Sequence, residues 1–164
     1  MDKSTLSSLY NGSDINEVWQ ASRHIPIIRH PQRGLISPNT YRAIHDGRAC
    51  PYCESIMVFG SNFRKYSVSE ARKAGYECQN SKGQVIINQA GTNPTIYFHR
   101  HYVSIDHKVN KARCPEKMFD YGNLEAVCWQ CNIEKSDNNS YKLEQGIKAI
   151  SRLADETLAE LKLL

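Results

Sequence analysis

The chain has 164 residues, the length of one ordinary domain, and its 40% hydrophobic residues suffice for a buried core. With 23% charged residues and a net charge of +4, the composition excludes a disordered chain. No apolar run approaches the roughly 20 residues that cross a membrane, and the N-terminus has no charged-then-apolar signal pattern, so we expect a cytoplasmic protein without membrane contact.

The first third of the chain predicts little regular structure. Residues 14–21 favour one or two helical turns, and residues 23–38, with three prolines and three arginines, predict an extended and irregular arm. Such an arm could cross a DNA backbone or serve as an unstructured tether. Ser37 is a predicted N-cap, with Pro38 at the first position of a short helix that ends near Asp46 and Gly47.

The middle of the chain predicts short strands. Residues 56–59 indicate a buried strand, and residues 67–74 predict a helix capped by Ser67. Residues 84–88 and 95–98 predict a hairpin with a longer turn. Alternation from Tyr97 onward predicts one continuous strand that ends in Asp106-His107, with His99 and His101 on one face.

The last third begins with a predicted loop, residues 108–122. Residues 123–127 then lead into a Cys-x-x-Cys knuckle, and a helix through Asn132 and Lys135 is expected to end near residues 137–139. From 140 to 164, apolar residues at 143, 147, 150, 154, 158 and 161 predict an amphipathic helix, which could pack on the domain or mediate dimers.

Positive charge is concentrated in the middle of the sequence. Residues 60–115 carry nine Lys or Arg and three acidic residues, whereas residues 116–164 carry six and nine. A polyanion such as nucleic acid would be attracted to this stretch, and a solvated surface loop is the alternative interpretation. Arg100 is a phosphate-contact candidate on charge alone; His99 and His101 could help position phosphate or serve in packing.

Four of the six cysteines form two Cys-x-x-Cys pairs, Cys50/Cys53 and Cys128/Cys131. In a reducing compartment this pattern favours a tetrahedral Zn²⁺, and four thiolates would leave no open position for chemistry, so we predict a structural zinc site. Two alternatives remain. Cys50-Pro-Tyr-Cys53 matches the glutaredoxin active-site sequence, and the cysteines could be unrelated free thiols, as we expect for Cys78 and Cys114.

Asp106-His107 offers the groups that phosphodiester hydrolysis needs. A histidine near its ordinary pKa can act as a general base, and Mg²⁺ or Mn²⁺ on oxygen ligands can neutralise developing charge. Asp106 provides a carboxylate and Asn132 an amide oxygen. A satisfied structural Asp-His pair is the alternative interpretation.

The residues Asp106-His107-Lys-Val, then Asn123-Leu-x-x-Val-Cys128-x-x-Cys131-Asn132-x-x-Lys135-Ser136, resemble the HNH endonucleases, and the four cysteines resemble the zinc-stapled branch of that family. The resemblance covers about residues 48–137 and is sharpest over 105–136. It implies that His107 is the general base, that Asp106 and Asn132 hold the catalytic cation, and that Asn123 orients His107 by holding the loop. It also implies phosphate contact or a structural role for Lys135, and Lys108 is a further nucleic-acid-binding candidate.

Two positions depart from the family pattern. Asn110 stands where many members have proline, for which we expect a local loop difference, and Asn132 is the weaker ligand of the two usual choices, which leaves the metal preference and the turnover open.

The resemblance implies an α+β chain with a ββα-metal core. We expect an N-terminal arm and short helix over 1–47, a zinc-stapled HNH nuclease domain over 48–137, and a C-terminal amphipathic helix over 138–164. A basic hairpin insertion at about 60–98 would help to set where the enzyme cuts, with the core against the minor groove.

The expected activity is metal-dependent hydrolysis of DNA, with RNA as an alternative substrate and with a homodimer or a partner protein left open. A zinc-dependent nucleic-acid-binding module without catalysis and a thiol-disulfide oxidoreductase are the alternative functions.

Overall fold

The computed structural model describes residues 12–80, 82–91, 93–135 and 141–161, and it is an α+β structure with small antiparallel sheets and helices. The chain divides into two compact units, one ending at Glu134 and one beginning at Lys135, and each is described by itself. Within the described ranges, no helix has the length and apolar content needed to cross a membrane.

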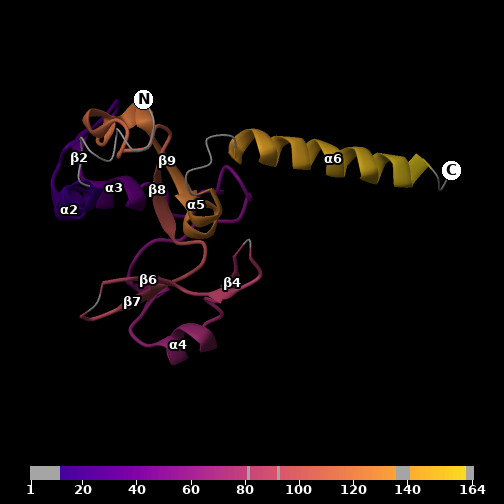
Figure 1. Cartoon of the computed structure of the whole chain (residues 1–164), viewed down its shortest axis with the longest axis horizontal. Coiled ribbons are helices and arrows are strands. Elements are labelled where there is room, and N and C mark those ends of the chain that lie inside the picture. The colour runs from indigo at the N-terminus through magenta and orange to yellow at the C-terminus, as the bar shows by residue number, and fades with distance from the viewer. Residues whose placement is uncertain (1–11, 81, 92, 136–140, 162–164) are drawn as a thin grey trace. The chain divides into compact units, whose positions relative to one another are not determined.

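The first unit is organised around the hairpin of β8 (Val103–His107) and β9 (Leu124–Cys128), which is followed directly by α5 (Trp129–Lys135) (Figure 1). The two strands pair antiparallel, from Val103 opposite Cys128 to His107 opposite Leu124. Because side chains alternate along a strand, Ser104 and Asp106 share one face of the hairpin with Glu125. The prediction that a strand ends at Asp106 and His107 is confirmed. The helix predicted to follow Cys131 begins earlier, at Trp129.

The N-terminal segment packs into the same core as this hairpin, and in Figure 1 its helices lie beside β8. Ile28 and Ile36 are directly paired and buried, with Gly34 at φ +71° near the turn between them. The irregular arm predicted for residues 23–38 is therefore wrong, because burial of this pair favours a tight hairpin. The predicted Ser37 cap is confirmed: its Oγ accepts a hydrogen bond from the Thr40 amide. The elements are α2 (Gly12–Ala21), η1 (Ser22–His24), β1 (Ile28–His30), β2 (Gly34–Ile36) and α3 (Pro38–Ala43).

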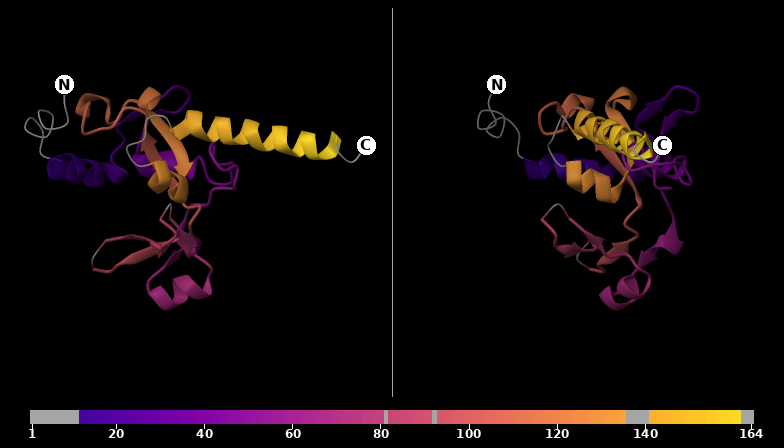
Figure 2. Two further views of the ribbon diagram at one scale, coloured as in Figure 1. Left: turned by 45° about the vertical axis from the view of Figure 1, so that its right-hand side comes forward. Right: turned by 90° about the vertical axis from the view of Figure 1, so that its right-hand side faces the viewer.

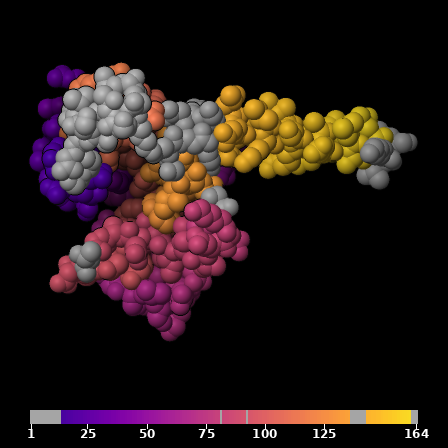
Figure 3. Space-filling view, viewed as in Figure 1, coloured from indigo at the N-terminus to yellow at the C-terminus, as the bar shows by residue number. Residues whose placement is uncertain are grey.

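Residues 61–98 form a small lobe next to the Val103 end of β8, below the hairpin in Figures 1 and 2. On the face shown in Figure 3, the atoms of this lobe form one compact magenta-to-pink body. The helix capped by Ser67 is confirmed. The elements are η2 (Ser61–Phe63), β3 (Arg64–Lys65), α4 (Val68–Lys73), β4 (Cys78–Gln79), β5 (Val85–Ile86), β6 (Asn88–Ala90) and β7 (Ile96–Phe98), with sheet orders β3-β7-β6 and β4-β5.

Three predicted strands differ from the observed ones. The hairpin predicted between 84–88 and 95–98 forms only in part, because β5 pairs back onto β4, whereas β6 pairs with β7. Residues 56–59 make two isolated bridges instead of a strand, and Ile56 is 58% exposed. The continuous strand predicted from Tyr97 is wrong, because a turn closed by the Tyr102 amide on the His99 carbonyl separates β7 from β8.

The loop from β8 to β9 contains η3 (Pro115–Lys117) and η4 (Tyr121–Asn123). In the second unit, α6 (Tyr141–Leu161) confirms the predicted C-terminal helix. Ser136, the helix end predicted near 137–139, and the outer ends of the predicted C-terminal helix, residue 140 and residues 162–164, lie outside the described residues.

Candidate functional site

The four cysteines of the two knuckles come together in space. Their Sγ atoms all lie within 4.8 Å of one another, and the Sγ atoms of Cys53 and Cys128 are 3.7 Å apart. A tetrahedral Zn²⁺ with Zn–S bonds of about 2.3 Å requires Sγ–Sγ separations of about 3.8 Å. The four thiolate donors and their spacing therefore fit a zinc ion. A zinc ion bound here would link the loop at residues 50–53 to the junction of β9 and α5.

Backbone amides support this thiolate cluster. The amide of Cys128 donates to Sγ of Cys50 at 3.3 Å, and the amide of Cys131 donates to Sγ of Cys128 at 3.5 Å. Hydrogen bonds from the Cys128 and Cys131 side chains lower the pKa of the Cys50 thiol, so the cluster favours at least one thiolate. Glu54 has φ +60°, the left-handed conformation that closes the first knuckle turn. Cys78 and Cys114 lie outside the cluster, as predicted.

Asp106 and Asn132 reach one face of the β8–β9 hairpin. Asp106 is 7% exposed on β8, and Asn132 projects from α5 and donates from Nδ2 to Oγ of Ser104 at 2.6 Å. Ser104 is two residues from Asp106, so its side chain lies on the same face of β8. A strand and the helix that follows the hairpin thus bring the two predicted oxygen donors to the same face of the hairpin.

Glu125 and Tyr52 join this face, and the sequence did not single them out. Glu125 pairs with Asp106 across the hairpin, and the Tyr52 hydroxyl donates to it at 2.7 Å. Burial, then the hydrogen bond and charge of Glu125, then the charge of Asp106 raise the pKa of Tyr52, so its hydroxyl stays protonated and remains a donor. The only sequence signal for Glu125 was its place in residues 123–127, which lead into the second Cys-x-x-Cys knuckle.

His107 is oriented by the loop and by the N-terminal helix. Its Nε2 lies 3.0 Å from the carbonyl oxygen of Met118. Because a carbonyl only accepts hydrogen bonds, Nε2 carries the proton, and the lone pair of the neutral ring is on Nδ1. The ring also packs against Trp19 with centroids 4.8 Å apart at an interplanar angle of 72°. Trp19 was not identified from the sequence.

Asn123 holds the loop between β8 and β9. It is 5% exposed, its Oδ1 accepts from the Val109 amide at 2.7 Å, and its Nδ2 donates to the carbonyls of Val109 and Lys117 at 3.1 and 3.0 Å. Its own carbonyl accepts from the Lys108 amide at 2.9 Å. These bonds fasten the backbone that directly follows His107, as the sequence interpretation proposed for this residue.

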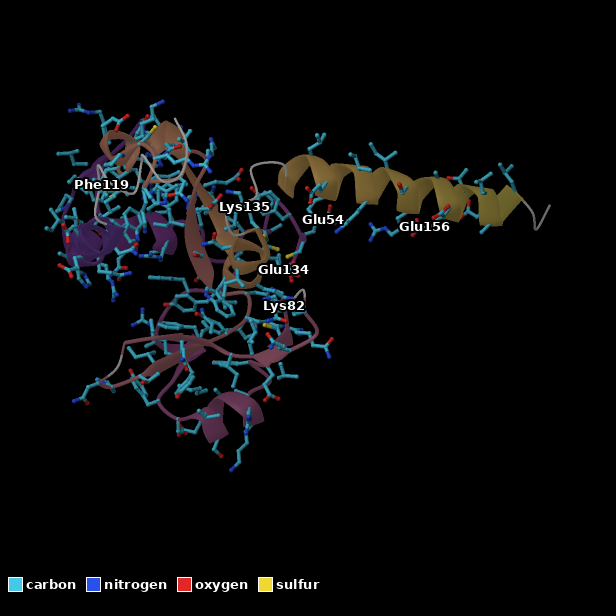
Figure 4. The ribbon with its side chains drawn as sticks, viewed as in Figure 1. Glu54, Lys82, Phe119, Glu134, Lys135 and Glu156 are labelled. Carbon is cyan, nitrogen blue, oxygen red and sulfur yellow. The ribbon has the colours of Figure 1, made fainter. Side chains whose placement is uncertain are left out.

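The predicted nucleic-acid-binding residues belong to three different segments of the chain. Lys108 directly follows His107 and is exposed, and its Nζ donates a hydrogen bond to the carbonyl of Gly122 at 3.0 Å. Arg100 is exposed before β8, at the other end of a five-residue strand that is about 13 Å long. Lys135 is only 8% exposed, at the end of α5, where Figure 4 labels it with Glu134.

His99 and His101 lie in the turn before β8 with ring centroids 5.5 Å apart, and burial lowers the pKa of each. Their surroundings are largely aromatic, since His99 packs on Tyr76 and Phe63. The structure therefore places them in packing at the Arg100 end of β8, away from Asp106 and His107.

A recess of about 390 Å³ opens beside the outer edge of β9. Basic side chains, Glu125 and tyrosine rings line the recess. Two of these residues adjoin the candidate site: Lys108 directly follows His107, and Glu125 lies opposite Asp106 in the hairpin. The polar and aromatic lining residues are Tyr41, His45, Arg48, Lys108, Tyr121 and Glu125.

Comparison of the chain with protein-family models, with curated proteins and with solved structures finds no match. The chemistry is therefore inferred from the residues themselves. The hairpin has four soft thiolate donors near the Cys128 end of β9. On the face that carries Ser104 it has oxygen donors from Asp106 and Asn132, which suit a hard cation, and at its His107–Leu124 end it has an oriented imidazole, which suits proton transfer.

Proposed function

We propose that this protein is a metal-dependent endonuclease of the HNH type that hydrolyses DNA phosphodiester bonds. The observation that supports the proposal best is the β8–β9–α5 unit, which corresponds to the ββα-metal arrangement. It has Asp106-His107 at the end of the first strand, Asn123 in the loop and Asn132 on the helix.

His107 is the proposed general base. A water molecule gives its proton to Nδ1, and the water oxygen forms a bond to phosphorus as the bond from phosphorus to the leaving oxygen breaks. The carbonyl of Met118 holds Nε2–H throughout and stabilises the imidazolium that forms. Asn123 keeps the backbone next to His107 in place, which fixes where the ring stands.

Asp106 and Asn132 are the proposed ligands of Mg²⁺ or Mn²⁺. Because Nδ2 of Asn132 is bonded to Ser104, its Oδ1 is the amide atom suited to a hard cation. When bound, the cation would neutralise charge on the scissile phosphate and stabilise the leaving oxygen. In this proposal the Cys₄ zinc is structural, and it holds the loop at residues 50–53 against the start of α5.

DNA is the proposed partner on grounds of charge and space. Basic residues are concentrated between residues 60 and 115, and Lys108 is exposed next to the proposed base. The recess along β9 adjoins both Lys108 and Glu125, and it could take a nucleotide next to the scissile phosphate. One such site cuts one strand, so a double-strand break would need a second copy, a partner protein or a second binding event.

Plasmid cleavage tests the proposal. With Mg²⁺ or Mn²⁺ the wild-type protein should nick supercoiled DNA, and His107→Ala should reduce the rate by roughly 10² to 10⁴-fold, because general base catalysis contributes on that order. His24→Ala is the matched control, since it makes the same substitution at an exposed histidine. Zinc content and DNA binding are measured on all three proteins.

Equal cleavage by His107→Ala and wild type would contradict the proposed base. If the zinc-loaded protein binds DNA with a steep salt dependence but cuts nothing, the non-catalytic binding module replaces the nuclease.

A further inference from the structure

Trp19 is a buried core residue that also contacts the imidazole ring of His107. It lies on α2, far from the Asp106–Lys135 segment in sequence, and it is 6% exposed. Ile15, one helical turn earlier, is also buried, so the two residues mark the face of α2 that enters the core. The ring of Trp19 contacts the imidazole of His107.

Trp19 contacts both parts of the His107 arrangement. Its ring meets the imidazole at 4.8 Å and 72°, and it stacks on Phe119 with centroids 5.6 Å apart at 20°. Phe119 directly follows Met118, whose carbonyl accepts the hydrogen bond from Nε2 of His107. Figure 4 labels Phe119 close to the N-terminal helices. One indole thus holds the imidazole ring and also the segment that carries the acceptor of its hydrogen bond.

An imidazole has two rotatable side-chain bonds and two neutral tautomers. A histidine that acts as a general base needs one defined ring orientation and one defined tautomer. The hydrogen bond to Met118 selects the Nε2–H tautomer only while the ring plane stays aligned with that carbonyl. An edge-to-face aromatic contact restricts the ring plane. Removal of the indole would therefore release the ring tilt and the Phe119 segment together.

We propose that Trp19 is a positioning residue for the base, so that α2 is part of the functional site rather than an N-terminal appendage. This inference rests on the proposed function of His107. Trp19 acts through the imidazole and through the Met118–Phe119 segment, and it does not touch the substrate in this proposal.

Kinetics of three variants test the proposal. Trp19→Leu keeps an apolar side chain but removes the ring, Trp19→Phe restores a ring, and Ile15→Val is the control for a small packing change on the same helix face. We expect Trp19→Leu to lower kcat roughly 10 to 100-fold with little change in KM, because small misplacements of a catalytic group cost on that order. Trp19→Phe should recover most of the loss, and Ile15→Val should resemble wild type.

Nitrogen NMR of the His107 imidazole gives a readout that does not depend on cleavage. In the folded, zinc-loaded wild type the neutral ring should show protonated Nε2 and unprotonated Nδ1, and Trp19→Leu should show a mixture of tautomers that Trp19→Phe reverses. A folded Trp19→Leu with the wild-type tautomer signal overturns the proposal, as does a wild-type kcat.

If the wild type cuts no DNA, the proposed function fails. The tautomer measurement then decides alone whether Trp19 orients His107.

Discussion

The two ends of the β8–β9 hairpin hold their polar groups in different ways. Near the Val103–Cys128 end, four cysteines converge on one point and fit a single ion. At the His107–Leu124 end, the backbone and side chains are held by separate bonds: Asn123 to Val109 and Lys117, and His107 to Met118 and Trp19. The first arrangement should be lost all at once, whereas the second should weaken contact by contact.

The two sets of groups also have different proposed roles: the cysteines stabilise the fold, and Asp106, His107 and Asn132 serve the proposed reaction. Four thiolates complete a tetrahedral shell and leave no position for a reactant. Elsewhere on the hairpin, Asp106 and Asn132 offer oxygen donors and His107 offers an imidazole, which are the groups that the proposed cation and the proposed proton transfer would use. Variants at each end test whether the two ends differ in this way.

The largest effect is expected at the cysteines. Cys131→Ser should abolish zinc binding and the cooperative thermal unfolding of the first unit, because structural zinc sites contribute roughly 10 kcal/mol or more to folding. A strong chelator added to the wild type should have the same effect. Zinc content and circular dichroism melting are the measurements, and Cys114→Ser, outside the cluster, is the control. A zinc-loaded Cys131→Ser with the wild-type melting midpoint would show that the cluster is not the fold's anchor.

Asn123→Asp should give the largest effect at the polar end. The substitution places a carboxylate oxygen against the carbonyls of Val109 and Lys117, which now accept hydrogen bonds from Nδ2. We expect the unfolding free energy to fall by about 3 kcal/mol, since two buried acceptors lose their donor. Urea denaturation measures it, and Asn110→Asp, which keeps the acceptor for the Ala112 amide, is the control. Equal stability of the two variants would refute the role assigned to Asn123.

A smaller effect is expected where α5 meets β8. Ser104→Ala removes the acceptor of Asn132 Nδ2 and should cost about 1 kcal/mol. A double-mutant cycle with Asn132→Ala isolates that bond and should return a coupling of similar size. Additive effects in the cycle would mean that the Ser104–Asn132 bond does not contribute to stability.

The smallest effect is a pH dependence at His45, which lines the recess beside β9. Burial is the main cause that lowers the pKa of His45 from its ordinary 6.5, while its Nδ1 bonds to the Tyr41 carbonyl. The unfolded chain therefore binds a proton more readily, and stability is lost as the pH falls below about 6.5. Melting at pH 7.5 and 5.5 should show a larger acid-induced loss in the wild type than in His45→Asn. The same loss in both proteins would exclude His45 as the source.

Elements governed by neighbouring residues were predicted correctly. Ser37 and Ser67 each cap a short helix through the amide three residues later, and periodic apolar residues predicted the helix Tyr141–Leu161. The strand ending at Asp106-His107 followed from local alternation. The strand from Tyr97 failed at residues 99–102, because the backbone turns there to bring β8 alongside β9, and alternation alone cannot reveal such a turn.

The sequence by itself determined which donors this protein has and how they are grouped: two Cys-x-x-Cys pairs, an Asp-His pair and two asparagines at fixed spacing. Those groupings depend on turns and strands of a few residues. Only the tertiary structure decided that the two knuckles meet, that Glu125 and Tyr52 stand beside Asp106, and that Trp19 packs on His107. The physical reason is that these contacts join residues distant in the chain, and their geometry is set by burial of a shared core rather than by any local pattern.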